Sequence, residues 1–215
     1  GYEFNIAYSG GDSNYSNPNG FRYTIGLNGG YSKNEIEFID EVSGAPEWQL
    51  REGKPLGAYL LYETDGVFYD QSEIDANAVD YSQVTPQLRP GDLRLVDYDG
   101  NGKIDADDQV RQEDSFTPRL QYGITLDMSY KNFDLSILFQ GSQGGLTTLF
   151  NGEFGDWGNY YKYQHDNRWS IDNPSREHPR LASRGDTWYT DGGYGNNTYN
   201  YGSTDYLRLK NIELG

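Results

Sequence analysis

The sequence predicts an all-β fold, namely a segment of a transmembrane antiparallel β-barrel with long extracellular loops. Three observations lead to this prediction. Several segments alternate apolar and polar residues with a period of two, the connections between them are alternately short and long, and the composition is rich in Tyr and Gly, with 20 and 27 of the 215 residues. Such a composition is unlike that of a helical bundle or a doubly wound α/β enzyme.

The alternation identifies the expected strands, because successive side chains of a strand point to opposite faces. In four segments an apolar residue occupies every second position, except for Gly29 in the second, and mostly polar or small residues fill the positions between. A fifth strand is expected near the end of the chain, where the pattern does not define a single apolar face. The expected strands are residues 2–9, 21–32, 120–130, 133–140 and 205–214.

The alternation alone leaves two folds open, a soluble β-sandwich and a transmembrane β-barrel. Barrel strands need about 9 to 11 residues, with apolar side chains towards lipid and polar ones towards the lumen. A sandwich shows the same pattern when its outer face is in water. The tyrosines near the ends of several segments match the aromatic girdles of a barrel, at Tyr2, Tyr8, Tyr31 and Tyr130.

The lengths of the connections favour the barrel. Residues 10–20 and 131–132 form short turns, whereas residues 41–117 and 143–203 form two long connections. Short periplasmic turns and long extracellular loops are typical of outer-membrane barrels, and connections above about 15 residues are uncommon in compact soluble domains. Since no stretch approaches the roughly 20 apolar residues of a transmembrane helix, strands are the expected membrane-crossing elements.

Charge and composition exclude several classes of function. The net charge is −16, and residues 41–117 alone hold 17 acidic and 6 basic residues, so no nucleic-acid partner is expected. The absence of cysteine excludes a disulfide scaffold, a thiolate metal site and a cysteine nucleophile. Because the sequence also lacks the serine-hydrolase, phosphate-loop, dinucleotide and zinc-protease motifs, we expect no enzymatic activity.

An acidic segment within residues 41–117 has the spacing of a twelve-position calcium loop. It supplies oxygen ligands at positions 1, 3, 5, 7, 9 and 12, with Gly102 at position 6, where the chain must turn sharply. Position 12 is Asp rather than Glu, and a strand-like segment precedes the loop in place of a helix. The alternative is an acidic turn held by its own side-chain hydrogen bonds, but the complete match favours Ca²⁺ in a structural role. The expected ligands are Asp97, Asp99, Asn101, Asp105, Asp108 and the main-chain carbonyl of Lys103.

The second long connection, residues 143–203, is rich in aromatic residues and carries three of the four tryptophans. Aromatic side chains among Asn, Asp and Gly can stack on sugar rings or grip a peptide, which makes Trp157, Trp169 and Trp188 candidate ligand-binding residues. The same side chains can instead form the core of the loop or contact a partner protein. We favour this second interpretation, because a long loop needs apolar anchors to hold a shape.

An ordered series of short motifs spans almost the whole chain. The motifs are GYE at residues 1–3, KPLG at 54–57, TDGVF at 64–68, PGDL at 90–93 before the acidic segment, PRL at 118–120, KNFDLS at 131–136, FQG at 139–141, DNRW at 166–169, NP at 173–174, PRL at 179–181 and YLRLKNIELG at 206–215. Each motif is weak alone, but the ordered set resembles the C-terminal part of the barrel in the SusC/RagA family of TonB-dependent outer-membrane transporters.

This resemblance implies a barrel of about 22 strands that is plugged by an N-terminal domain. Such a protein imports oligosaccharides or peptides across the outer membrane of a Gram-negative bacterium, with energy from TonB and beneath a SusD-like surface lipoprotein. Residues 1–215 contain no plug domain and no TonB-binding segment, and five strands cannot close a barrel. We therefore expect a part of a larger polypeptide, whose partners are the rest of its barrel and plug, TonB, outer-membrane lipid and the lipoprotein.

A competing interpretation is a secreted, calcium-stabilised β-sandwich that acts as a glycan-binding or adhesion module. It explains the alternation, the aromatic residues and the acidity without a membrane. It explains neither the alternately short and long connections nor the ordered motifs.

Overall fold

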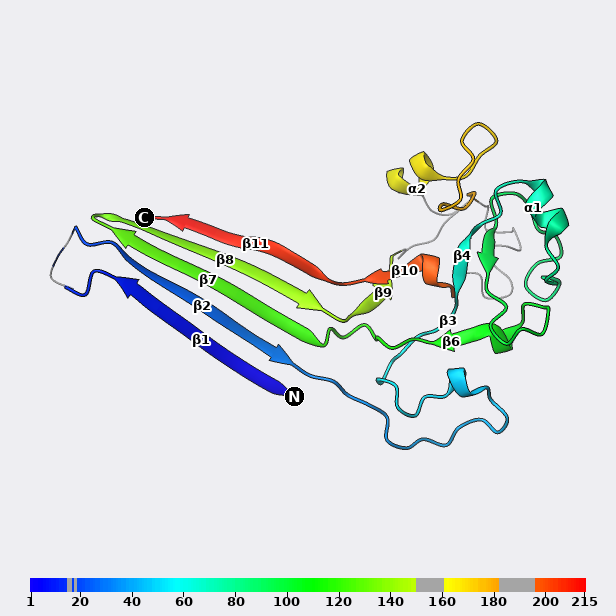
Figure 1. Cartoon of the computed structure of the whole chain (residues 1–215), viewed down its shortest axis with the longest axis horizontal. Helices are drawn as coiled ribbons and strands as arrows, with labels where there is room; N and C mark the ends of the chain where they lie inside the picture. Colours follow the sequence, from blue (N-terminus) through cyan, green and yellow to red (C-terminus); the bar gives the residue numbers. More distant parts are fainter. Residues whose placement is uncertain (15–16, 18, 150–160, 182–195) are drawn as a thin grey trace.

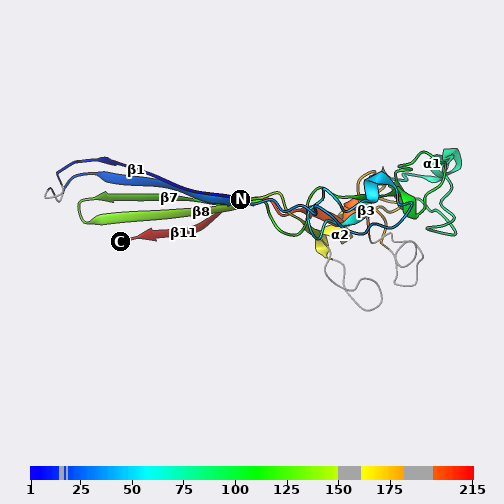
Figure 2. The same ribbon diagram turned by 90° about the horizontal axis from the view of Figure 1, so that it is seen from below.

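The computed structural model describes residues 1–14, 17, 19–149, 161–181 and 196–215. Figure 1 shows two parts, a long sheet and, at one end of it, a unit formed by the two long connections. We call this second part the loop unit and define it as the described residues of 33–117 and 144–204. Seen from below, the strands form a thin layer and the loop unit is thicker (Figure 2).

The five-stranded sheet is antiparallel throughout. Its strands lie in the order β1-β2-β7-β8-β11, so neighbours in sequence are also neighbours in space. Short turns join β1 to β2 and β7 to β8 at the end far from the loop unit (Figure 1). The bounds of the strands are Tyr2–Gly11, Arg22–Tyr31, Leu120–Tyr130, Phe133–Gln143 and Tyr206–Leu214, respectively.

The register places nearly all the apolar residues of the sheet on one face. Ile6 lies opposite Leu27, which in turn lies opposite Ile124. The other face carries polar and small residues in the same rows, such as Asn5 opposite Asn28. Among the described residues no second sheet covers the apolar face, as a β-sandwich would require. The apolar face consists of Tyr2, Phe4, Ile6, Tyr8, Tyr23, Ile25, Leu27, Tyr31, Leu120, Tyr122, Ile124, Leu126, Met128, Tyr130, Phe133, Leu135, Ile137, Phe139, Leu207, Leu209, Ile212 and Leu214.

A β-bulge explains why the last strand did not show one apolar face in the sequence. Leu209 pairs with Phe139 and Asn211 pairs with Leu138, so Lys210 is an extra residue on β11. An extra residue shifts the side-chain alternation by one position. Leu207 and Leu209 before the bulge and Ile212 and Leu214 after it therefore point to the same face.

The loop unit contains short elements of its own. Three two-stranded ladders pair β3 (Leu60–Tyr62) with β6 (Gln109–Arg111), β4 (Thr64–Val67) with β5 (Leu93–Leu95), and β9 (Leu146–Thr148) with β10 (Tyr201–Ser203). The described helices are α1 (Gln71–Ala76), α2 (Lys162–Asn167) and the 3-10 turns η1 (Glu47–Gln49), η2 (Ala106–Asp108) and η4 (Thr198–Asn200). None of the helices in this part of the chain is long and apolar enough to span a membrane.

The buried core of the described residues lies in the loop unit. Its apolar residues all come from the first long connection, and they are Tyr62, Val67, Phe68, Tyr81, Val84, Leu93, Leu95 and Ile104. The second long connection packs against them through Trp169 and Tyr199. Main-chain bonds add to this contact, since the Tyr62 N–H donates to the Asn196 carbonyl (2.8 Å). The two connections therefore fold together.

Candidate functional site

The acidic segment lies between β5 and β6 and brings three carboxylates together. Oxygens of Asp97, Asp99 and Asp108 all lie within 4.8 Å of one another. Asp108 is buried, Asp97 is half-buried and Asp99 is exposed. Three carboxylates at this spacing repel each other unless a proton or a cation lies between them.

The main chain wraps around the Asp97 carboxylate. Its Oδ2 accepts the Gly102 N–H (2.9 Å) and its Oδ1 accepts the Asn101 N–H (3.1 Å). Gly102 has a φ of 85°, a conformation that suits glycine and reverses the chain at the sixth position. The turn that the sequence predicts is therefore present.

Asp108 anchors the far end of the segment. Its carboxylate accepts the N–H groups of Tyr98 (2.7 Å) and Asp105 (2.8 Å). Burial raises the pKa of Asp108 above its usual value, although these N–H donors oppose the shift. A buried carboxylate beside two others gains most when a cation neutralises it.

The remaining expected ligands have other partners. The Asp105 carboxylate forms an ion pair with the Lys103 ammonium, which together with the Asp107 N–H lowers the pKa of Asp105. The Asn101 side-chain oxygen accepts the Lys103 N–H (3.0 Å). The cluster of three therefore includes Asp97, Asp99 and Asp108, but not Asp105. Its oxygen donors suit a hard divalent cation such as Ca²⁺.

Two residues distant in sequence hold the acidic segment from outside. The Trp48 indole N–H donates to the Asp107 carbonyl (2.7 Å), and the Gln49 amide donates to the Ala106 carbonyl (2.6 Å). The Trp48 ring also packs on Tyr98, with ring centroids 5.2 Å apart. The sequence alone does not predict these contacts, because nothing in the local pattern connects η1 to a segment more than 50 residues away.

Trp169 is a packing residue in this structure. Its indole N–H donates to the Tyr69 carbonyl (2.9 Å), and its ring covers Gly91, where a Cβ atom would lie 2.8 Å from the ring. These contacts join the second long connection to the first, and the indole N–H already has a hydrogen-bond acceptor within the loop unit. Trp157 and Trp188 lie outside the described residues.

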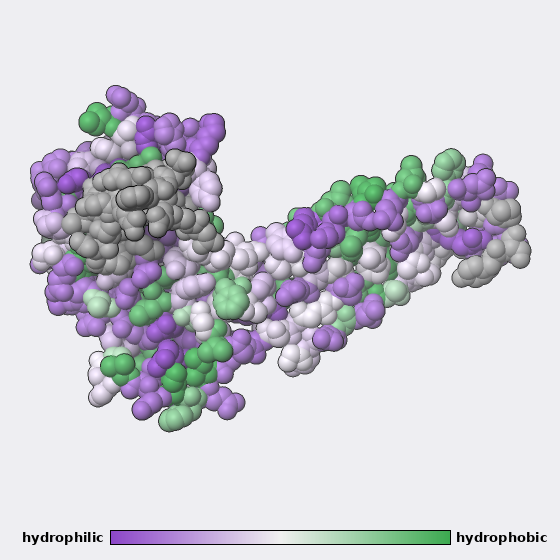
Figure 3. All heavy atoms as spheres, turned by 180° about the vertical axis from the view of Figure 1, so that it is seen from behind, coloured by the Kyte–Doolittle hydropathy of each residue, from purple (hydrophilic) through white to green (hydrophobic). Residues whose placement is uncertain are grey.

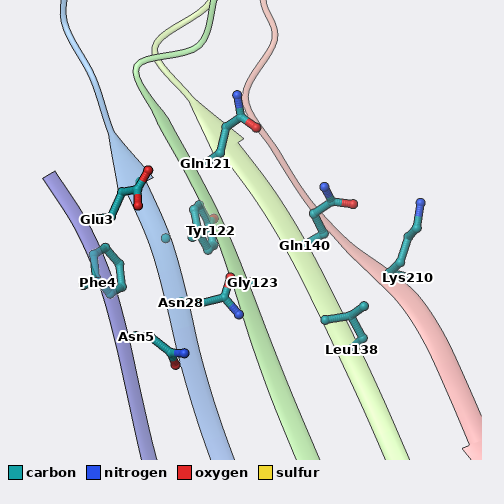
Figure 4. Close-up of a pocket in the computed structure, with 12 residues that line it drawn as sticks. Glu3, Phe4, Asn5, Asn28, Gln121, Tyr122, Gly123, Leu138, Gln140 and Lys210 are labelled. Atoms are coloured by element: carbon teal, nitrogen blue, oxygen red, sulfur yellow. The ribbon is translucent and has the colours of Figure 1, made fainter. Parts of the chain in front are cut away.

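The polar face of the sheet carries a hollow of about 790 Å³. Side-chain amides from four strands contribute to its lining, together with the charged groups of Glu3 and Lys210 and the apolar residues Phe4, Tyr122 and Leu138 (Figure 4). The amides are those of Asn5, Asn28, Gln121 and Gln140. Amides donate and accept hydrogen bonds, so this surface favours water or polar ligands over lipid.

Comparison with known proteins identifies relatives across the whole chain. No family model matches. The chain is 30% identical over 230 residues to "TonB-dependent receptor P3" of Formosa agariphila, covering 100% of the chain and 21% of that protein. It is also 30% identical over 179 residues to "TonB-dependent receptor P26" of the same organism, covering 82% and 17%. The chain thus spans about a fifth of the length of these curated relatives.

Solved structures show the same fold. The structure of the RagAB peptide transporter matches with a TM-score of 0.51 and 19% identity, over 98% of this chain and 22% of that chain. The RagAB peptide importer in the "open-open" state matches with a TM-score of 0.55 and 18% identity, over 98% and 21%. The predicted all-β barrel segment is therefore confirmed as the fold class.

Proposed function

The chain belongs to the TonB-dependent receptor family, and from this premise we propose that it forms part of the barrel wall and the extracellular loops of an outer-membrane nutrient importer. It contributes no enzymatic activity in this role. The family membership also agrees with the SusC/RagA resemblance of its motifs.

The two faces of the sheet are the observation that carries this proposal. An apolar face that extends across five strands is unfavourable in water, and lipid contact removes that penalty. The opposite face, with its amide-lined hollow, suits the water-filled interior of a barrel. Tyr2 and Tyr31 at one end, and Tyr8, Tyr23 and Tyr130 towards the other, match the two membrane interfaces.

The long connections support an assignment of the loop unit to the outer side. Outer-membrane barrels have short periplasmic turns and long extracellular loops, so the loop unit is assigned to the cell surface. The motifs of the chain resemble the SusC/RagA family, and this resemblance implies a SusD-like lipoprotein above this surface as the expected partner. The structural neighbours are named as the RagAB peptide transporter and importer. Oligosaccharides and peptides are the proposed substrate classes, with TonB acting through the plug.

A structural Ca²⁺ ion in the acidic segment is the second part of the proposal. Asp97, Asp99 and Asp108 would hold it, with Asn101, Asp105 and the Lys103 carbonyl completing the shell after side-chain rearrangement. The clustering of the three carboxylates and the burial of Asp108 support it. Bound there, the ion would fix the acidic segment between β5 and β6 and would take no part in transport chemistry.

Surface labelling of the full-length receptor tests this function. We would place a single cysteine at Ser82 in the loop unit and another at Asn132 in the β7–β8 turn, in a receptor with no other accessible cysteine. A membrane-impermeant maleimide should label position 82 in intact cells and position 132 only after the outer membrane is opened. A receptor found in the soluble secreted fraction would contradict the proposal and favour the adhesion-module alternative.

A further inference from the structure

The segment that joins β2 to β3 exposes apolar side chains on the surface of the loop unit. We call residues 33–58 the arm; it contains η1. Phe38, Val42 and Leu56 are 83%, 75% and 72% exposed. Hydrophobic side chains gather at the lower end of the loop unit, where the arm lies (Figure 3). Apolar residues exposed to this degree on one segment mark an interaction surface.

The arm is held in place although its apolar residues are uncovered. Its two limbs are joined by main-chain bonds between Ile36 and residues 53 and 54, at 3.0 Å each. η1 is bonded to the acidic segment through Trp48 and Gln49. The Arg111 guanidinium also donates to the Gln49 carbonyl. A surface that is already ordered loses little conformational entropy when a partner binds.

The position of the arm indicates what covers it. β1 is an edge strand, and the described residues pair it only with β2. The arm lies on the β1 side of the loop unit (Figure 1). A barrel has no free edge, so a further strand of the same polypeptide must lie along β1, and the connection above that strand rises beside the arm.

We propose that Phe38, Val42 and Leu56 dock against an extracellular loop of the same polypeptide, carried by the strand next to β1. This inference rests on the proposed barrel function. The chain spans 21% of its relative TonB-dependent receptor P3, and a protein of that length has ample sequence to supply such a loop. The arm also exposes the carboxylates of Glu37 and Glu47, so the docking loop is expected to present apolar residues with Lys or Arg at their rim.

Photo-crosslinking in the full-length receptor tests the docking. p-Benzoylphenylalanine at position 38, irradiated in outer membranes, should cross-link to a peptide of the same polypeptide outside residues 1–215. The same amino acid in place of Ile171, which is 86% exposed on the other connection, is the matched control and should not label that peptide. A cross-link from position 38 to a separate protein, or none at all, would overturn the inference.

Substitution gives an independent readout. Phe38 and Val42 are 83% and 75% exposed, so Phe38→Ser with Val42→Ser should leave the fold and the bonds within the arm intact but separate the arm from the docking loop. Without that cover, proteases should reach the arm more easily, and cleavage within residues 33–58 should rise roughly fivefold or more. Ile171→Ser should not change it. Unchanged proteolysis of the double variant would contradict the docking. A receptor that does not reach the outer membrane even as wild type would instead refute the barrel function itself.

Discussion

Arg180 and Asp92 form a buried ion pair that joins the two long connections, with 2.7 Å between Arg180 Nε and Asp92 Oδ1. Asp92 is fully buried, and its second oxygen accepts the Arg89 N–H (2.8 Å). The Arg180 N–H donates to the Gly91 carbonyl (2.8 Å) beside it. The two long connections are thus joined at this place by a side-chain ion pair and by a main-chain hydrogen bond.

Removing the Arg180 guanidinium should lower the stability of the loop unit. Arg180→Ala removes the guanidinium that pairs with the buried Asp92 carboxylate. Removing one member of a buried ion pair typically costs about 3–5 kcal/mol, and we expect a loss of stability of this order in the loop unit. Hydrogen–deuterium exchange on the full-length receptor in detergent should show faster exchange in β4 and β5.

Arg176 provides the matched control for that variant. It pairs with Glu73 (2.5 Å) at the surface, where the Arg176 side chain is 62% exposed. Arg176→Ala should cost less than about 1 kcal/mol. Equal exchange in the two variants would show that the buried Arg180–Asp92 pair stabilises the loop unit no more than the exposed Arg176–Glu73 pair does.

Glycine at position 141 makes room for an aromatic ring on the apolar face. Gly141 lies directly opposite Tyr122, and a Cβ atom there would lie 2.4 Å from the tyrosine ring. Gly141→Ala should therefore displace the ring and cost about 1–3 kcal/mol. Gly30→Ala, where the nearest atom would lie 3.8 Å away, should be close to neutral. Thermal unfolding of both full-length variants in detergent measures the difference.

Calcium should protect the acidic segment from exchange and proteolysis. When a site exists only in the folded segment, Ca²⁺ at a concentration about 100-fold above its Kd raises the free energy of unfolding of that segment by about 2.7 kcal/mol. Asp97→Asn with Asp99→Asn should abolish this protection, whereas Asp75→Asn on α1 should preserve it. Identical protection of residues 97–108 in calcium and in chelator would rule out the ion and leave the hydrogen-bonded acidic turn.

The start of α1 should weaken in acid. The Tyr69 N–H (2.9 Å) and the Arg176 guanidinium hold the pKa of Glu73 below its usual value of 4.5. A lowered pKa in the folded state stabilises the fold above the ordinary glutamate range, and this stabilisation is lost as the pH falls through the folded-state pKa. The protection of the amides in residues 69–76, that is, their exchange rate relative to the intrinsic rate at the same pH, should therefore fall below about pH 4.5. Glu73→Gln should reduce that pH dependence but not abolish it, because hydrogen bonds from Ser72 and from the Glu73 N–H also lower the pKa of Asp70, the N-cap of α1.

The strands were predictable because their signal is local. Alternation placed β7 at residues 120–130, as the structure has it, and the Lys131-Asn132 turn follows, with Lys131 at a φ of 58°. β11 was less clear, because the bulge at Lys210 reverses the alternation within the strand. Because of this one extra residue, the apolar face of β11 can be recognised from the strand pairing but not from the sequence pattern.

The fold of the long connections was not predictable in the same way. The Asp92–Arg180 pair joins residues 88 positions apart, and Trp48 reaches the acidic segment from 59 positions away. A periodic pattern of apolar residues along the sequence does not reveal contacts between residues this far apart. The spacing of the acidic segment did predict a turn at Gly102 and the approach of Asp97 to Asp108, but it did not reveal that Asp105 pairs with Lys103.

In the proposed barrel wall, one face of the sheet meets lipid and the other meets water, and two adjacent positions on β7 distinguish these two environments. Ile124 belongs to the apolar face and Thr125 to the polar one. Spin labels on Ile124→Cys and Thr125→Cys of the full-length receptor in lipid vesicles would be relaxed by dissolved oxygen and by a water-soluble nickel chelate. We predict that oxygen relaxes the label at position 124 strongly and the nickel chelate relaxes it weakly. The ratio of the oxygen effect to the nickel effect should fall sharply at position 125. Equal accessibility at the two positions, or a label at 124 shielded from both reagents, would contradict a lipid-facing barrel wall.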